Sequence, residues 1–411
     1  MKTEIITIGD ELLIGQTINT NAAWLGQELS LIGIKVNHSS TISDEKTIIY
    51  NALSEAEKRS NLIIITGGLG PTKDDITKAI LCDFFNTELV LNHEVLEDIK
   101  AFFTTRNVPF LEVNKLQAML PKSCVVIRNK VGTASGMWFE KNEKIFISMP
   151  GVPYEMKHLM KSELLTKIKN HFSSKELYHR TIITHGKGES YLAEKVSDWE
   201  NELRNIGLDL AYLPSPGIVR MRISSKNNET ELVNQKVEEL YSLIPDYIFG
   251  ENEDTMALIL GKILLEKNKT ISLAESCTGG YTSHLITEIP GCSKYFEGSI
   301  ICYSYDIKEK ELNIPHDLLV NKGAVSQEIT EILSLEVQKK YKTDCSIAIS
   351  GIAGPDGGTD EKPVGTVWIT VRDGEKVVSK KFNFGSNRER NIKQSAISAL
   401  NLLRLLLINN S

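Results

Sequence analysis

A glycine-rich segment followed by two carboxylates is the first part of the sequence that could do chemistry. It spans residues 66–77 and reads TGGLGPTKDDIT. Glycines let a backbone approach a phosphate closely, and free N–H groups at the start of a helix attract anions. Asp74 and Asp75 would repel that phosphate unless a divalent cation lay between them. The segment therefore favours metal-assisted chemistry on a phosphate ester or anhydride, with Asp10 as a third carboxylate from a neighbouring strand end.

The same segment also has a purely structural interpretation. Glycine-rich turns are common, and Asp in the first turn of a helix often only complements the helix dipole. No G-x-x-x-x-G-K-[ST] or G-x-G-x-x-G string occurs in the chain, so neither a P-loop nor a Rossmann dinucleotide site is supported. From the spacing alone, a phosphate site and a simple turn remain alternatives.

A second segment with possible chemistry is ISLAESCTGG at residues 271–280, which again reads as strand, turn and helix. It places the hydroxyl of Ser276 beside the backbone N–H groups of the next three residues, which could stabilise an oxyanion. These residues are Cys277, Thr278 and Gly279. A serine in this position is also a common N-cap, so the string alone leaves a nucleophile and a helix cap as alternatives.

Three other segments favour the nucleophile. A lysine near a phenol lowers the pKa of that phenol, so Tyr303 and Lys308 could remove the serine proton without a histidine. The run SGIAGPDGG at residues 350–358 follows a third strand, and its glycines permit close approach to a ligand. Arg388 and Arg390 open the last helix and could hold a phosphate, although solvated surface arginines are the commoner outcome.

Apolar periodicity predicts the elements that position these residues. Between residues 1 and 170, strand-like runs at 4–8, 34–37 and 62–66 alternate with amphipathic helical stretches. This pattern predicts a parallel sheet with helices on both faces, which is an α/β domain. Ligands of such sheets bind where loops leave the carboxyl ends of the strands. Asp10 and the glycine-rich segment both fall at such ends.

Two further domains are expected downstream. Residues 171–250 predict a small α+β domain, and its tip, THGKG at 184–188, resembles the glycine loop of a KH-type module, which can clamp a nucleic-acid backbone. We favour a spacer role for this domain because the chain is acidic. The polar stretch 250–255 predicts a linker. Residues 251–411 restart the α/β pattern, with a helix expected at 277–288.

The composition limits the possible classes of function. The 411 residues carry a formal net charge of −6, which argues against a protein that coats nucleic acid. The six cysteines form no C-x-x-C pair, so we expect reduced thiols and no zinc site. No stretch of 18 apolar residues occurs, and Glu4 and Asp10 interrupt the first apolar run. We therefore expect a cytoplasmic protein with neither a nucleic-acid nor a membrane partner.

Longer strings in the first domain resemble a known family. IGDELLIG at 8–15, the segment 66–77 and PGVPYEM at 150–156 are similar to the N-terminal domain of the CinA family (competence/damage-inducible protein A), which resembles the molybdopterin-binding fold. The resemblance implies a three-layer α/β domain with a metal-dependent ADP-ribose pyrophosphatase activity that yields AMP and ribose 5-phosphate. The expected ligands of the metal, Mg²⁺ or Co²⁺, are Asp10, Asp74 and Asp75. The residues expected to contact the nucleotide are Asn21, Gly67, Gly68, Gly70, Thr72, Thr77 and Gly151.

The third domain resembles the C-terminal domain of the same family and its stand-alone form, nicotinamide-nucleotide amidase. The resemblance covers residues 256–407 and implies hydrolysis of nicotinamide mononucleotide to nicotinate mononucleotide and ammonia, without a cofactor. By motif position, Ser276 would be the nucleophile, activated by Tyr303 and Lys308. Tyr305 departs from the family, which commonly has Asn there. The residues implied to bind the substrate are Cys277, Thr278, Gly279, Ser293, Ser350, Gly351 and Arg390.

The sequence as a whole is interpreted as a bifunctional hydrolase of pyridine-nucleotide recycling. Its ligands would be nicotinamide mononucleotide and ADP-ribose, and the resemblance implies a homodimer. Two alternatives stay open: an amidase with a non-catalytic, molybdopterin-like first domain, or an accessory scaffold in competence or DNA repair.

Overall fold

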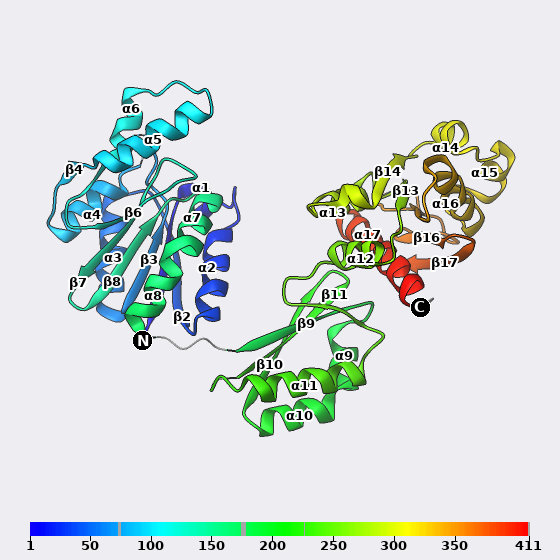
Figure 1. Cartoon of the computed structure of the whole chain (residues 1–411), viewed down its shortest axis with the longest axis horizontal. Coiled ribbons are helices and arrows are strands. Elements are labelled where there is room, and N and C mark those ends of the chain that lie inside the picture. Colours follow the sequence, from blue (N-terminus) through cyan, green and yellow to red (C-terminus); the bar gives the residue numbers. More distant parts are fainter. Residues whose placement is uncertain (73–74, 174–177, 226, 410–411) are drawn as a thin grey trace. The chain divides into compact units, whose positions relative to one another are not determined.

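The computed structural model describes residues 1–72, 75–173, 178–225 and 227–409. The chain divides into two compact units, Met1–Tyr178 and His179–Ser411 (Figure 1). No helix within the described ranges combines the length and apolar composition that a membrane crossing needs.

The first unit contains a six-stranded sheet. Its strands are, in spatial order, β2 (Val36–Ile42), β1 (Thr3–Ile8), β3 (Leu62–Thr66), β8 (Lys144–Met149), β7 (Gly136–Lys141) and β6 (Val125–Ile127). A separate two-stranded sheet pairs β4 (Leu89–Leu91) with β5 (Met119–Pro121). The helices are α1 (Asp10–Leu13), α2 (Thr20–Leu31), α3 (Lys46–Arg59), α4 (Thr77–Phe85), α5 (His93–Thr105), α6 (Glu112–Lys115), α7 (Pro153–Leu159) and α8 (Leu165–Phe172).

Alternation along the strands divides this unit into three layers. Ile5 of β1 packs in a core with α2, α7 and α8, whereas Ile6, the next residue, packs in a second core with α3, α4 and α5. Successive strand residues point to opposite faces, so a strand that is apolar throughout must be covered on both sides. The predicted three-layer α/β fold is confirmed for this unit.

Two details of the predicted sheet are wrong. The sheet is mixed, because β7 pairs antiparallel with both β8 and β6, whereas β1, β2, β3 and β8 pair in parallel. The strand expected at 34–37 runs instead over Val36–Ile42, whose sequence VNHSSTI is largely polar. This strand lies at the edge of the sheet, where a polar face can be solvated.

The second unit begins with a four-stranded antiparallel sheet packed with helices. Its strands in spatial order are β10 (Leu208–Ser215), β11 (Ile218–Ser225), β9 (His179–His185) and β12 (Ile248–Glu251), and its helices are α9 (Glu189–Lys195), α10 (Ser197–Asn205) and α11 (Thr230–Leu243). The linker expected at 250–255 is therefore partly wrong, because Gly250 and Glu251 belong to β12 and pair with β9.

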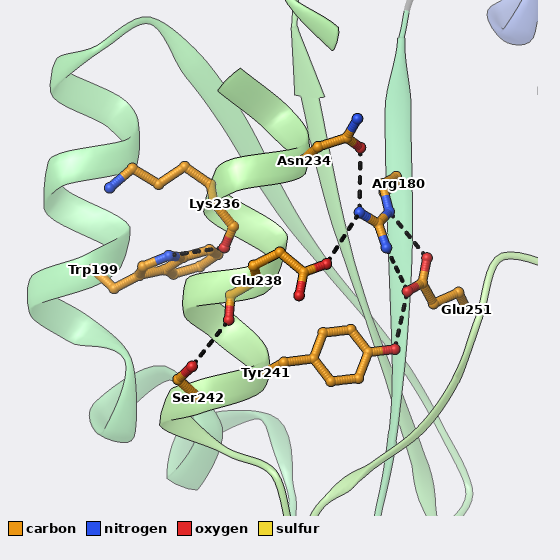
Figure 2. Close-up of polar contacts among 8 residues, drawn as sticks. All are labelled: Arg180, Trp199, Asn234, Lys236, Glu238, Tyr241, Ser242 and Glu251. Carbon is orange, nitrogen blue, oxygen red and sulfur yellow. Dashed lines mark hydrogen bonds and ion pairs between the residues drawn. The ribbon is translucent and has the colours of Figure 1, made fainter. Parts of the chain in front are cut away.

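An ionic network ties α11 to this sheet (Figure 2). The Arg180 guanidinium donates to both oxygens of Glu251, at 3.0 and 2.5 Å, and to Asn234 on α11 at 3.2 Å. The Tyr241 hydroxyl donates to the same Glu251 carboxylate at 2.9 Å. Burial, reinforced by this anionic acceptor, raises the pKa of Tyr241, so the phenol stays protonated.

The rest of the second unit is a five-stranded sheet between two layers of helices. Its strands in spatial order are β14 (Phe296–Ile301), β13 (Ile271–Glu275), β15 (Cys345–Gly351), β16 (Thr366–Asp373) and β17 (Lys376–Asn383). One face packs with α12 (Met256–Glu266), α13 (Tyr281–Thr287) and α17 (Arg388–Ile408). The other face packs with α14 (Tyr305–Leu312), α15 (His316–Lys322) and α16 (Gln327–Tyr341).

The two sheets of the second unit share one hydrophobic core. Ile183 of β9 and Phe249 of β12 are buried in the same cluster as Leu260 of α12 and Leu400 of α17. The helix expected at 277–288 begins only at Tyr281, because Gly279 and Gly280 have φ of +58° and +96° and form a turn that glycine adopts without strain.

Candidate functional site

Ser276 follows the last residue of β13, between two parallel neighbours, β14 and β15. Its N–H donates to the Ile349 carbonyl at 3.0 Å, which extends the β13–β15 ladder by one residue. Ala274 lies in the core formed with α14, α15 and α16, and strand alternation directs Ser276 to the same face. The strand end therefore presents the hydroxyl to α14.

Lys308 on α14 contacts the Ser276 hydroxyl in the protein interior. Its side chain is buried, and Nζ lies 3.2 Å from Ser276 Oγ, 2.5 Å from the Cys302 carbonyl oxygen and 3.1 Å from the Tyr303 carbonyl oxygen. None of these three atoms carries a formal charge. Burial lowers the pKa of Lys308 below its ordinary value of 10.5. As a neutral amine it can donate to the two carbonyls and accept the serine proton, which is the arrangement of a Ser–Lys pair.

Tyr303 has a different partner from the one expected. Lys308 contacts its backbone carbonyl, whereas its phenol receives a hydrogen bond of 3.3 Å from Arg388 Nη2. The other amino group of Arg388 donates to the Gly354 carbonyl at 2.7 Å, which anchors the guanidinium in the third glycine loop. Tyr303 and Arg388 are both exposed, so this contact lies at the protein surface.

The buried carboxylate of Glu275 stabilises the segment that follows Ser276. Glu275 accepts hydrogen bonds from the N–H groups of Thr282 and Ser283 at 3.0 and 2.9 Å, and from the Ser283 hydroxyl at 2.5 Å. This residue was not singled out from the sequence. The available indication was a Glu at the end of a largely apolar strand, directly before the serine.

Of the three N–H groups expected to stabilise an oxyanion, one is already occupied. Gly279 N–H donates to the Ser276 carbonyl at 3.1 Å, whereas those of Cys277 and Thr278 donate to no backbone carbonyl in the described part of the chain. The Thr278 hydroxyl oxygen is buried without a hydrogen-bond partner among the described residues. Buried polar atoms are normally paired, so this turn offers donors to a bound ligand.

The structure brings Ser350 and Gly351 to this strand end but separates Ser293 and Arg390 from it. Ser350 Oγ donates to the Ala324 carbonyl at 2.8 Å. Gly351 is required for packing, because a Cβ there would lie 2.6 Å from Val367 Cγ2. Ser293 precedes β14 and so lies at the opposite end of the sheet from Ser276 within the same chain. Arg390 lines a different cavity, next to the middle domain.

The glycine-rich segment of the first unit borders a cavity of about 370 Å³ at the carboxyl ends of β1, β3 and β8. A Cβ at Gly67 would clash with the Ile8 carbonyl, and one at Gly151 would lie 3.3 Å from Gly67 Cα. These glycines let the strand ends meet and form the floor of the cavity. The lining residues that carry polar side chains are Glu11, Asp44, Asp75, Thr133 and Glu155.

Asn21 lies in an adjoining cavity of about 300 Å³ that shares Ile8, Glu11, Gly151 and Val152 with the first. Its Nδ2 donates to the Gly151 carbonyl at 2.7 Å, while its Oδ1 is buried without a partner among the described residues. The side-chain oxygen of Asn21, Oδ1, is therefore available to a ligand that carries an N–H or O–H group.

Asp75 closes the glycine-rich loop on itself. Its carboxylate accepts from Gly70 N at 2.7 Å and from Thr72 N at 3.0 Å, and it also contacts the Thr72 hydroxyl. Gly68 is constrained in a similar way, because a Cβ there would clash with the Thr77 hydroxyl, which is buried without a partner among the described residues. The loop glycines therefore have a structural role beside any ligand role.

The expected metal ligands do not form a site in the described part of the chain. Asp74 lies outside the described residues, and the described His, Cys, Asp and Glu side chains include no group of three that could hold a metal ion. Asp10 is exposed and its N–H donates to Asp44 Oδ2 at 3.2 Å. Burial, and then the charges of Asp10, Glu11 and Asp75, raise the pKa of Asp44.

Glu155, in the first turn of α7, is a carboxylate at this cavity that was not identified from the sequence. It accepts from Asn129 Nδ2 at 2.6 Å, and burial raises its pKa. Gly132 leaves room for it, because a Cβ there would clash with the Glu155 carboxyl group. The available indication in the sequence was its position at the start of the helix that follows β8, because ligands of such sheets bind at the carboxyl ends of the strands.

The fold and its two strand-end sites define a three-domain α/β protein with a molybdopterin-binding-like first domain. Family models match three successive parts of the chain: "Probable molybdopterin binding domain" over residues 4–170, "Damage-inducible protein CinA KH domain" over 179–250 and "CinA C-terminal domain" over 253–407. The chain is 45% identical over 405 residues to a CinA-like protein of Cytophaga hutchinsonii, covering 98% of this chain and 97% of that one. The chain belongs to the CinA family.

Two further proteins are similar to this chain. A CinA-like protein of Flavobacterium psychrophilum is 43% identical over 419 residues, which covers all of this chain and 99% of the relative. The solved structure of competence/damage inducible protein CihA from Agrobacterium tumefaciens is 30% identical, covers 37% of this chain and 93% of its own, and has a TM-score of 0.36.

Proposed function

We propose that the chain is a bifunctional hydrolase, which deamidates nicotinamide mononucleotide at Ser276 and hydrolyses ADP-ribose at the glycine-rich cavity of the first unit. The observation that carries the first activity is the buried contact of 3.2 Å between Lys308 Nζ and Ser276 Oγ. A buried lysine whose neighbours are two carbonyls and a hydroxyl has no evident purpose in stability, because burying an ammonium group without a counter-charge is costly.

The deamidation proceeds by acyl transfer. Ser276 Oγ attacks the carboxamide carbon of the substrate while its proton passes to Lys308 Nζ, which is neutral at that moment. Donors of the turn at Cys277 and Thr278 stabilise the oxyanion. The carbon–nitrogen bond then breaks, and the leaving nitrogen takes the proton from Lys308 and departs as ammonia. Water attacks the ester and gives one proton to Lys308, which passes it to the departing serine oxygen, and the acid product then loses its proton to solvent to become the carboxylate.

Arg388 and Tyr303 would hold the nucleotide phosphate. The guanidinium is oriented by its bond to the Gly354 carbonyl and still reaches the Tyr303 phenol, so two donors converge at the protein surface. Arginine binds phosphate well because its planar fork offers several N–H donors.

For ADP-ribose, the support is the cavity at the ends of β1, β3 and β8, together with Asn21 Oδ1 in the adjoining cavity, which has no partner among the described residues. Glu155 would accept a proton from the attacking water, since burial raises the pKa of its carboxyl group and so makes the carboxylate a stronger base. A divalent metal, Mg²⁺ or Co²⁺, is part of the proposal, although the described carboxylates include no group of three that could hold it.

An ammonia assay with nicotinamide mononucleotide tests the first activity. Ser276→Ala should abolish ammonia release with an unchanged thermal unfolding midpoint, and Ser299→Ala, a serine on the neighbouring strand, serves as the matched control. Undiminished release by Ser276→Ala would overturn the assignment.

The second activity is tested separately, with ADP-ribose and Mg²⁺ or Co²⁺, with and without EDTA. Glu155→Gln should lower turnover by about 10²–10⁴ without affecting ammonia release. If the wild-type protein releases ammonia but no AMP under any metal condition, the first domain is a non-catalytic binder. If neither product forms, the scaffold alternative is favoured.

A further inference from the structure

A third cavity lies within the second unit, and neither Ser276 nor Lys308 is among its lining residues. Its volume is about 380 Å³, within the range of roughly 300–1,000 Å³ that small-molecule sites occupy. One wall is the loop 185–189 and the β10–β11 turn of the middle domain, and the other is the end of β17 with the outer face of α17. These walls belong to one unit with a shared hydrophobic core, so the cavity is part of a single packed structure.

Two cations define the charge of this cavity. Lys187, in the loop between β9 and α9, and Arg390, in the first turn of α17, both line it and both are exposed. Glu189 is the single acidic side chain among the described lining residues. His185 does not add charge near pH 7, because burial, followed by the charges of Arg404 and Lys380, lowers its pKa to about 4. The balance favours an anionic ligand.

An aromatic pair supplies an apolar part of the cavity wall. Phe382 and Phe384 are stacked, with ring centroids 5.3 Å apart and an interplanar angle of 14°, and both line the cavity. Such rings are suited to stacking with a planar heterocycle. Neither ring is fully buried, so part of this apolar surface is available to a ligand.

One lining residue of the cavity carries a hydrogen-bond acceptor that has no donor in the described part of the chain. Gln394 Oε1 is buried and has no hydrogen-bond partner among the described residues. Gln394 lies one helical turn after Arg390, and Gly217 of the β10–β11 turn packs against it, because a Cβ there would lie 3.6 Å from Gln394 Cγ. Beside it, His185 Nε2 and Ser398 Oγ lie 3.4 Å apart. Buried acceptors are normally hydrogen-bonded, so this oxygen can accept a hydrogen bond from an N–H group of a ligand.

We propose that this cavity binds a mononucleotide, with its phosphate between Lys187 and Arg390, its base on Phe384 and an N–H group of the base donated to Gln394 Oε1. A small ligand fits better than a nucleic-acid strand, because the cavity is bounded on both sides and the chain carries a net charge of −6. The site does not depend on either proposed activity, since Ser276 and Gly67 are not among its lining residues.

The experiment is photo-crosslinking of the full-length chain with 8-azido-AMP, followed by mass-spectrometric mapping of the labelled peptides. Label is expected on the peptides that contain residues 185–189 or 382–394. Excess AMP should suppress it, and adenosine, which lacks the phosphate, should do so only at higher concentration. Mapping separates this site from the cavity of the first unit, where a nucleotide would label other peptides.

Variants decide whether the cavity residues are responsible. Lys187→Ala and Gln394→Leu should each weaken AMP competition by about tenfold to a hundredfold, as expected for loss of a charge-assisted or buried hydrogen bond. Lys187→Arg should retain binding, and Lys195→Ala, on the exposed surface of α9, is the matched control. Thermal unfolding midpoints verify that the variants fold.

Three results would overturn the proposal: no label in either peptide, label that Lys187→Ala leaves unchanged, or stronger competition by an oligothymidylate than by AMP. The last outcome would assign the cavity to single-stranded nucleic acid instead.

Discussion

Lys308 Nζ and Ser276 Oγ lie 3.2 Å apart in the protein interior, although 32 positions of sequence separate them. The contact depends on two separate elements, the end of β13 and the first turns of α14. The backbone carbonyls of Cys302 and Tyr303 fix the amine from the other side. The lysine is thus positioned by main-chain atoms that substitution cannot remove.

The state of this lysine predicts the pH dependence of deamidation. Because burial lowers the pKa of Lys308 below 10.5, the neutral amine becomes populated at a lower pH than for a free lysine. The value of kcat/KM should rise with pH as the proton is lost and should level off below pH 10.5. Stopped ammonia assays across pH 6–10 measure this profile.

Lys308→Arg provides the control for that profile, because arginine stays protonated and cannot accept the serine proton. We expect deamidation to fall by about 10²–10⁴. A flat pH profile in the wild-type protein, or an active arginine variant, would show that another group is the base.

The two arginines at the start of α17 should behave differently. Arg388 contacts Tyr303 near the serine, whereas Arg390 lines the cavity beside the middle domain. Arg388→Ala should raise KM for nicotinamide mononucleotide by about tenfold or more, as expected for loss of a charge-assisted phosphate contact. Arg390→Ala should have a smaller effect on KM. If Arg390→Ala raised KM more than Arg388→Ala, Arg390 would belong to the amidase site, as the family resemblance implies.

Asp75 should control the order of the glycine-rich loop. Asn retains one oxygen but replaces the second acceptor with a donor, which cannot accept from the Gly70 or Thr72 N–H group. In Asp75→Asn, hydrogen exchange at these two amides should accelerate about tenfold, consistent with loss of roughly 1–2 kcal/mol. Asp44→Asn, at the same cavity, should leave both amides protected. Unchanged exchange in Asp75→Asn would show that the loop does not depend on this carboxylate.

Glu251 should stabilise the middle domain through the network in Figure 2. Its side chain and that of Arg180 are 24% and 18% exposed, so solvent screens the pair only partly. Glu251→Gln should reduce the free energy of unfolding by about 1.5–3 kcal/mol, measured by urea denaturation. Glu253→Gln, at an exposed position two residues further on, should have little effect. Equal stability of both variants would contradict a role for the ion pair.

Hydrophobic patterning predicted the buried strands well, because a short β-branched apolar run is typical of a strand that is covered on both faces. The runs at 4–8 and 62–66 match β1 and β3 to within one residue. The pattern misplaced β2, since a polar edge strand has no apolar run. It also predicted a wholly parallel first sheet, because a short hairpin such as β7–β8 does not change the local periodicity.

The candidate sites were predictable in part. Ser276 and Lys308 were identified, and the structure brings their side chains together. Partners that depend on tertiary packing could not be derived from spacing: Arg388 reaches Tyr303 across 85 positions, and Glu155 reaches Asn129 across 26. Ser293 was grouped with Ser276 by motif, yet it precedes its strand whereas Ser276 follows one.

The core shared by the middle and C-terminal domains bears on how the chain can be divided. The matched C-terminal domain begins at residue 253, but Ile183 and Phe249 close the same core that contains Leu260 and Leu400. A fragment that starts at 253 would leave that side of the core open to water, and such a surface promotes self-association. A fragment made to study the C-terminal domain should therefore start at residue 179, and the shorter piece is expected to aggregate.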